Sequence, residues 1–182
     1  MTTADTPRLI LVSGHIASGK TSVARRLADI AREQGMREAA LDMDDIVVSL
    51  AGGWSRAAEY DRLLAGEVTA LVIDRLFASG VHIVTVAGTT LAGGEWASLQ
   101  DVLKTPVDAV RVRLLVSLAE SQRRAQADIT RLATRDPAVV ELLYMRVDQA
   151  NMPTVDLELP TNGFTLEQVA QSLAEQVLQA PT

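Results

Sequence analysis

A glycine-rich stretch near the start of the chain constrains the fold more than any other feature. Residues Gly14 to Thr21 read Gly-His-Ile-Ala-Ser-Gly-Lys-Thr and match the pattern G-x-x-x-x-G-K-S/T in full. Before them, residues 9–12 are wholly apolar, which is typical of a strand buried on both faces. After them, apolar residues recur at steps of three or four, at Val23, Leu27 and Ile30. Gly35 then marks a helix end, so the stretch predicts a buried strand, a loop and a helix in succession.

A loop of this composition is suited to binding phosphate groups. Its glycines let successive backbone N–H groups turn toward a phosphate, and the N-terminus of the following helix adds a positive dipole end. We expect Lys20 to reach the β- and γ-phosphates of a nucleoside triphosphate and the Thr21 hydroxyl to ligate Mg²⁺. We expect His15 to contribute its backbone groups rather than acid–base chemistry. The predicted nucleotide-binding residues of this segment are Gly14, His15, Ile16, Ala17, Ser18, Gly19, Lys20, Thr21 and Ser22.

The composition fits one domain without covalent cross-links. At 182 residues the chain can bury a sizeable core, and no linker or repeat divides it, so residues 1–182 are expected to form a single unit. The lack of cysteine excludes disulfides and thiol chemistry. With 17 basic and 23 acidic residues the net charge is -6, so no global field attracts nucleic acid or an anionic membrane. Any anion must be bound locally.

The sequence also lacks the pattern of a membrane protein. No stretch is apolar over the ~18 residues that a membrane span requires. The start of the chain is polar and does not read as a signal peptide. We therefore expect a cytoplasmic protein.

The rest of the chain alternates between strand and helix patterns. Strands are predicted over residues 39–45, 81–86, 110–116 and 155–159. Helices are predicted for a long segment from about 60 to 80, at 94–103, within 118–135, from 137 onward and from 165 onward. Thr165 and Gln168 have the spacing of a capping box at the start of the last helix. This alternation predicts an α/β fold with a mostly parallel sheet.

Two of these elements carry further expectations. In the long helix, apolar residues at four-residue steps should form the buried face, at Tyr60, Leu64, Val68, Val72 and Leu76. His82 lies in an apolar run and should be a histidine of the core or of a sheet face.

Three carboxylates, those of Asp42, Asp44 and Asp45, end the second predicted strand. Ligands of open α/β sheets bind at the C-terminal ends of strands, so these side chains should face the γ-phosphate across the loop. If the strand continues through them, Asp42 and Asp44 lie on one side, and Asp45 on the other side or at the next helix start. One of the pair could orient water on Mg²⁺ while the other accepts a proton from an attacking hydroxyl. The alternative is an N-cap and a solvated turn, which we favour for Asp45.

Arginines crowd the segment from about 118 to 137, at Arg123, Arg124, Arg131 and Arg135. Guanidinium groups suit the charge that spreads over a transferring phosphoryl group. We therefore predict a short, mobile arginine-bearing lid over residues 118–137. The alternative is a helix whose solvated face happens to be basic.

Together these motifs resemble the small P-loop kinases of the shikimate kinase, gluconate kinase and chloramphenicol phosphotransferase kind. Leu41-Asp42-Met43-Asp44 is similar to an L-D-x-D element in which the second acid contacts the acceptor hydroxyl, and residues 155–163 are similar to the closing strand and its adenine-side turn. The resemblance covers nearly the whole chain. It implies a three-layer P-loop NTPase fold with a five-stranded parallel sheet in the order 2-3-1-4-5, flanked by helices, and the use of ATP with Mg²⁺.

The sequence departs from this group at the end of the third strand. Residues 86–90 read Val-Ala-Gly-Thr-Thr, where many relatives place an acidic residue. Metal binding is then expected to rest on Thr21 and Asp42. Trp54 and Arg56 lie where the family builds its acceptor pocket and could supply a stacking face and an anion fork. Thr89 offers a hydroxyl at the same crevice, the alternative being a plain turn.

The predicted function is ATP-dependent transfer of the γ-phosphoryl group to a hydroxyl of a small molecule, either a metabolite or an antibiotic. Lys20 holds the phosphates, Asp44 positions or deprotonates the acceptor, and Arg124 and Arg131 stabilise the transition state. By the same resemblance, further contacts to the nucleotide are assigned to Arg123 and Asn162.

Two alternatives stay open at this point. A nucleotide kinase would need extra basic residues for an acceptor phosphate, for which Arg56 and Arg62 are available. A non-catalytic protein that binds a nucleotide or a small ligand is the other. In every case we expect a small-molecule partner, no nucleic acid or membrane, and a monomer or homodimer.

Overall fold

The computed structural model describes residues 6–53, 56–88, 94–129, 135–149 and 154–178. Its centre is a parallel five-stranded sheet in the order β2-β3-β1-β4-β5, which confirms the predicted order. The strands are β1 Arg8–Gly14, β2 Glu38–Asp42, β3 Ile83–Ala87, β4 Asp108–Leu115 and β5 Leu157–Pro160.

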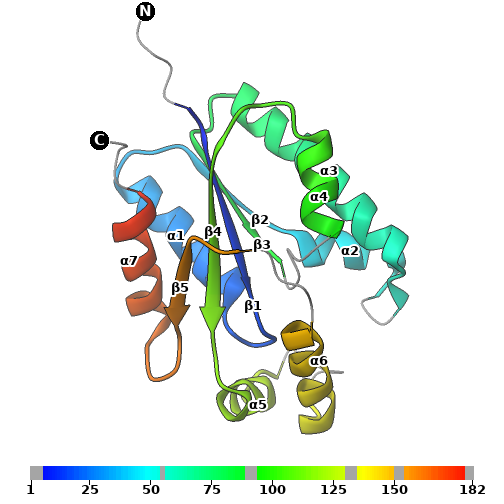
Figure 1. The fold of residues 1–182 in the computed structure, drawn as a ribbon. Helices are drawn as coiled ribbons and strands as arrows, with labels where there is room; N and C mark the ends of the chain where they lie inside the picture. Colours follow the sequence, from blue (N-terminus) through cyan, green and yellow to red (C-terminus); the bar gives the residue numbers. More distant parts are fainter. Residues whose placement is uncertain (1–5, 54–55, 89–93, 130–134, 150–153, 179–182) are drawn as a thin grey trace, which may run out of the picture.

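Helices cover both faces of the sheet and one of its ends (Figure 1). Those in the described residues are α1 Lys20–Glu33, α2 Met43–Ala51, α3 Glu59–Ala78, α4 Gly94–Val102, α5 Leu118–Ala127, α6 Pro137–Gln149 and α7 Leu166–Val177. α1 and α7 pack together on one face, and α3 and α4 pack together on the other. α5 and α6 lie beyond the C-terminal ends of β1 and β4. No helix in the described ranges is long and apolar enough to cross a membrane.

The central strand β1 explains the apolar run that opens the chain. Ile10 and Val12 face a core built with α1 and α7, whereas Leu9 and Leu11 face a second core built with α3 and α4. All four side chains are at most 1% exposed. A strand covered by helices on both faces needs apolar residues at every position, which is why no alternation is seen.

The buried face of α3 differs from the prediction. Tyr60 is 69% exposed, and the helix instead buries small residues together with one isoleucine, namely Ala65, Gly66, Thr69, Ala70 and Ile73. A stripe at four-residue steps rotates by about 40° per step around a helix, so it cannot stay on one face over five turns. A Cβ at Gly66 would lie 2.7 Å from the backbone oxygen of Glu95 in α4, so the small face lets the two helices approach closely.

Two other expectations are wrong at the ends of strands. His82 is exposed because β3 begins one residue later, at Ile83. The second strand does not continue through the acidic cluster: β2 ends at Asp42 and α2 begins at Met43. The predicted capping box of Thr165 and Gln168 at the start of α7 is confirmed.

A half-buried carboxyl on β2 gives the fold a pH dependence. Thr85 Oγ1 donates a hydrogen bond to Glu38 Oε1 at 2.7 Å, while Oε2 is buried with no hydrogen-bond partner among the described residues. Burial raises the pKa of Glu38 to about 7 from its ordinary 4.5, and the Thr85 bond opposes this only in part. The folded state therefore binds this proton more tightly than the unfolded chain does, and stability falls as the pH rises between these two values.

Replacing Glu38 with Gln should flatten this part of the stability profile. The wild-type protein should lose free energy of unfolding between about pH 5 and pH 8, because the buried carboxyl ionises in that window. Glu38→Gln cannot ionise and should lose less. Urea denaturation at the two pH values measures the difference, with Glu67→Gln, at an exposed position on α3, as the control. The same loss in Glu38→Gln as in the wild-type protein would contradict this assignment.

Candidate active site

The phosphate loop connects β1 to α1 at the C-terminal edge of the sheet. Gly14, the last residue of β1, has φ +144°, and a Cβ there would lie 2.5 Å from the backbone oxygen of Leu114 in β4. Gly19 caps α1 with φ +97°. Both positions lie in a backbone region that side chains disfavour, which accounts for the two glycines of the motif. The loop thus has the strand–loop–helix geometry predicted for it.

The side chain of Lys20, the first residue of α1, bonds back to this loop. Its ammonium donates hydrogen bonds to the backbone oxygens of Gly14 and His15, both at 3.0 Å, and the residue is 8% exposed. Ser18 N–H donates to the same His15 oxygen at 3.2 Å and closes a tight turn. A cation and the N-terminus of α1 therefore meet at one point, as an anion-binding site requires.

Two oxygen groups from distant parts of the chain meet beside the loop. Thr21 Oγ1 donates a hydrogen bond to Asp42 Oδ2 at 2.5 Å. The pairing of β2 with β3 and of β3 with β1 sets Asp42, Ala87 and Val12 in one row, which brings the end of β2 close to the start of α1. A hydroxyl and a carboxylate are oxygen donors of the kind that Mg²⁺ prefers, so this pair fits the predicted metal site. Among the described residues, no group of three or more His, Asp or Glu side chains could hold a metal ion.

The acidic cluster forms the start of α2 rather than the end of a strand. Asp42 is the N-cap, and its Oδ1 accepts the backbone N–H of Asp44 at 3.0 Å. Asp44 is half-buried in the first helical turn, and Asp45 is exposed. The cap therefore fixes the backbone of Asp44 relative to Asp42 and, through it, to Thr21.

Arg124 on α5 reaches the rim of the phosphate loop. Its guanidinium donates to Thr161 O at 2.6 Å and Thr161 Oγ1 at 3.1 Å, and more weakly to Ser18 O at 3.5 Å. Glu120 Oε1 accepts a further bond from Arg124 Nε at 2.7 Å. Hydrogen bonds from Arg123 and Arg124 lower the pKa of Glu120 to about 2. Arg124 is thus held between the loop and the turn that follows β5.

The other predicted lid and adenine-side residues lie differently. Arg123 is largely exposed and pairs with Glu120 at 2.7 Å. Asn162 links the turn after β5 to the start of α5, because its side chain bonds Ser117 N at 3.0 Å and Ser117 Oγ at 2.7 Å. Arg131 lies outside the described residues. Of the predicted lid arginines that lie within the described residues, only Arg124 contacts the loop.

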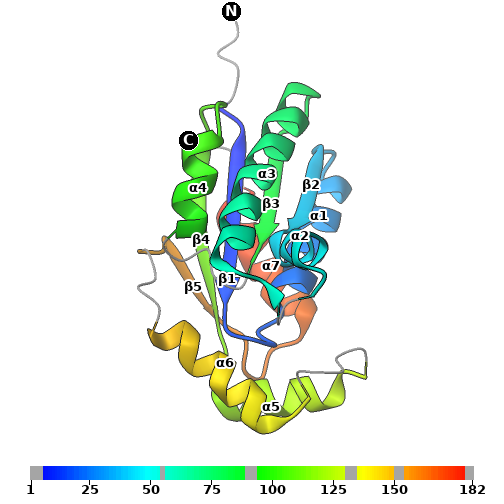
Figure 2. The same cartoon turned by 90° about the vertical axis from the view of Figure 1, so that its right-hand side faces the viewer.

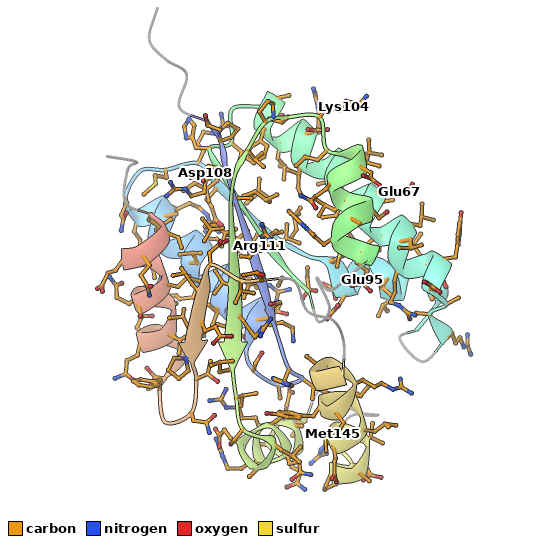
Figure 3. All side chains as sticks on the ribbon, viewed as in Figure 1. Glu67, Glu95, Lys104, Asp108, Arg111 and Met145 are labelled. Carbon is orange, nitrogen blue, oxygen red and sulfur yellow. The ribbon has the colours of Figure 1, made fainter. Side chains whose placement is uncertain are left out.

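The predicted acceptor side is described in part. Trp54 and Thr89 lie outside the described residues, and Arg56 is exposed in the short segment before α3. Arg62 Nε lies 3.6 Å from Oε1 of the buried Glu95, and Arg62 Nη1 donates to Ala57 O at 3.1 Å. Figure 3 shows Glu95 at the end of α4 that faces the C-terminal edge of the sheet.

Several residues in contact with the loop were not predicted. Ser121 Oγ on α5 donates to Ile16 O at 2.7 Å, and the Tyr144 ring on α6 stacks on the His15 imidazole. Two residues that bond Arg124 were not predicted as site residues either: Thr161, in the turn that the resemblance placed on the adenine side, and Glu120. Glu120 had a signal in the sequence, since it lies three and four residues before two arginines on a helix. Ser121 and Tyr144 meet the loop through the tertiary fold.

No family model matches this sequence. No curated protein matches it significantly. Comparison with solved structures does find matches over nearly the whole chain. The APS kinase CysC of Mycobacterium tuberculosis, solved with AMPPNP and APS, has a TM-score of 0.68 at 19% identity and covers 97% of this chain and 100% of its own.

Two further neighbours are a shikimate kinase and a sugar kinase. Shikimate kinase from Acinetobacter baumannii, in complex with shikimate, has a TM-score of 0.58 at 21% identity, covering 96% of this chain and 94% of its own. A sugar kinase from Janibacter sp. has a TM-score of 0.66 at 18% identity, covering 96% of both chains. The described site and these neighbours agree on one architecture: the chain has the fold of the small P-loop kinases.

Proposed function

We propose that this protein is an ATP-dependent phosphotransferase that moves the γ-phosphoryl group to a hydroxyl of a small molecule. The observation that carries the proposal is the buried Lys20 side chain, whose ammonium bonds the Gly14 and His15 backbone oxygens of the glycine-rich loop, beside the Thr21–Asp42 pair. The neighbours add support, because they are kinases of small molecules and one was solved with an ATP analogue. The acceptor of this chain is a small hydroxyl compound of unassigned structure, and the compartment in which we expect the reaction is the cytoplasm.

Lys20 and the loop amides bind and orient the triphosphate. Lys20 exchanges its bonds with the Gly14 and His15 oxygens for bonds with the β- and γ-phosphates. After this exchange the Lys20 ammonium lies against the negative charge that develops on the phosphates. No mobile side chain has to be ordered from solvent for this purpose. Arg124 is paired with Glu120 through Nε and places its two Nη atoms at the rim of the loop, on the side of the turn after β5.

Thr21 and Asp42 would hold Mg²⁺, which neutralises charge on the phosphate oxygens when it is bound. Both oxygens of Asp42 already have partners, Thr21 and the Asp44 N–H. Asp42 therefore serves the metal side and the cap of α2. Asp44, the next carboxylate in this turn, is left as the group that accepts the proton of the attacking acceptor hydroxyl.

Of the two arginines available for an acceptor phosphate, Arg62 is already paired within the protein, which weighs toward a hydroxyl acceptor. A nucleotide kinase needs cations that are not already neutralised. Arg62 lies 3.6 Å from the buried Glu95 carboxylate, so the charge of this arginine is balanced within the protein. An ADP-release screen of hydroxyl-bearing metabolites, antibiotics and nucleoside monophosphates tests the acceptor class directly. ADP release stimulated only by nucleoside monophosphates would contradict the hydroxyl assignment.

Lys20→Ala should remove most of the activity. The variant loses the only cation bonded inside the loop in the described structure, so turnover should fall by about 10²-fold or more and ATP should bind more weakly. Calorimetric ATP titration and ADP release with the identified acceptor measure the two effects. Lys104→Ala is a matched control, because Lys104 is the only other lysine and lies at the opposite end of the molecule from α6 (Figure 3). An unchanged Lys20→Ala enzyme would refute the phosphate-loop assignment.

Asp44→Asn should separate catalysis from binding. An amide cannot accept the acceptor proton, so turnover should fall by about 10² to 10⁴-fold while the Kd for ATP stays near the wild-type value. Asp45→Asn, an exposed neighbour in the same helical turn, is the control. Steady-state kinetics with ADP release measure turnover. Equal turnover in Asp44→Asn and the wild-type protein would remove Asp44 from the mechanism.

Asp42→Asn should weaken the affinity for Mg²⁺. Asn is as good an N-cap as Asp, so α2 should keep its start while one anionic oxygen donor is lost. We expect the Mg²⁺ concentration for half-maximal activity to rise several-fold with little change in melting temperature. A Mg²⁺ titration at fixed ATP, with circular dichroism melting alongside, measures both quantities. An unchanged Mg²⁺ requirement would place the metal elsewhere.

A further inference from the structure

Tyr144 on α6 contacts both the phosphate loop and the end of β4. Its ring stacks on the His15 imidazole, with ring centroids 3.8 Å apart and planes inclined by 15°. Its hydroxyl donates a hydrogen bond to the backbone oxygen of Val116 at 2.7 Å, just beyond β4. His15 itself is 8% exposed. The Tyr144 hydroxyl is therefore bonded to the chain just beyond β4, and the face of its ring packs on the His15 side chain.

Two contacts from α5 reach the same side of the loop. Ser121 Oγ donates to Ile16 O at 2.7 Å, and Arg124 Nη1 lies 3.5 Å from Ser18 O. Figure 2 shows α5 and α6 side by side below the ends of β1 and β4, and the two helices pack against each other. α6 thus contacts the loop at the His15 ring, and α5 contacts it at the carbonyl groups of Ile16 and Ser18. These contacts engage the His15 ring and the two carbonyl oxygens rather than the loop N–H groups.

His15 connects the ring contact to the groups that bind phosphate. Its backbone oxygen accepts hydrogen bonds from Ser18 N–H at 3.2 Å and from Lys20 Nζ at 3.0 Å. A side chain stacked on a fixed ring restrains the backbone that carries it. Through the stack on His15, we propose that Tyr144 is a positioning residue that holds the phosphate loop in its triphosphate-binding shape. This inference rests on the proposed function, because it takes the phosphates of ATP to bind in the loop.

The expected effect is on affinity for phosphates rather than for the base. A loop that is already ordered loses little conformational freedom when it binds a ligand. A loosened loop must become ordered on binding, and the conformational entropy that it loses reduces the affinity. Because Tyr144 acts through the loop, its loss should weaken the binding of a triphosphate that carries no base as much as it weakens the binding of a nucleotide. This separates a positioning role from a direct contact with adenine.

The test is a calorimetric titration of AMPPNP and of inorganic tripolyphosphate, each with Mg²⁺. Tyr144→Leu removes the ring and the hydroxyl, whereas Tyr144→Phe removes only the hydroxyl and should rescue binding. Met145→Leu, at a half-exposed neighbour on α6, is the matched control. We expect the Kd for both ligands to rise about five-fold in Tyr144→Leu, because a change of that size corresponds to the loss of one aromatic contact. In Tyr144→Phe both Kd values should change less than about two-fold.

His15→Leu removes the other half of the stack and provides a second route if Tyr144→Leu does not fold. It should raise both Kd values by a similar factor, and the double variant should be no weaker than either single variant. Additive losses, or wild-type affinity in a folded Tyr144→Leu or His15→Leu protein, would overturn the proposal. Weaker AMPPNP binding with unchanged tripolyphosphate binding would also overturn it, because the tyrosine would then act on the base. A wild-type protein that binds neither ligand would refute the proposed function, and this inference with it.

Discussion

The close contact between β1 and β4 at Gly14 determines where the phosphate loop begins. A side chain at this position would collide with the backbone oxygen of Leu114, so only glycine lets the chain leave the sheet there. The five residues that follow reach α1, which starts at Lys20. That geometry places the lysine next to the carbonyl groups at which the loop starts. The cation, the helix N-terminus and the loop amides are all placed by this one turn.

The order of the strands assembles the remainder of the site around this turn. On one side of β1, the rows through β3 and β2 bring Asp42 to Thr21. On the other side, β5 pairs with β4, so Thr161 follows the end of the sheet and meets Arg124. Residues that are far apart in the chain therefore reach the loop from both sides because parallel strands end at one edge.

α5 and α6 hold the loop at this edge of the sheet. The lid segment 118–137 was predicted from its arginines, and Arg124 on α5 does contact the loop. A serine on α5 and a tyrosine on α6, outside that segment, contact the loop backbone and the His15 ring. Attachment of this kind lets the loop stay ordered before any ligand arrives, which reduces the entropy that binding must overcome.

The sequence was informative where local chemistry decides the structure. The loop motif, the apolar strand before it and the capping box of α7 are local patterns, and all three are found as expected. The sheet order followed from the family resemblance. Tyr60 was misplaced because close packing against α4 determines the buried face of α3. His82 was misplaced because β3 begins only where its pairing with the neighbouring strands begins, at Ile83. The His15–Tyr144 stack joins positions with no shared pattern, so only the folded structure could reveal it.

A crystal structure with AMPPNP and Mg²⁺ tests the central claim most directly. The account predicts β- and γ-phosphate density enclosed by the backbone amides between Gly14 and Thr21, with Lys20 Nζ moved from the Gly14 and His15 oxygens onto the phosphates. Phosphates bound elsewhere, with Lys20 still on those two carbonyl oxygens at saturating ligand, would contradict it.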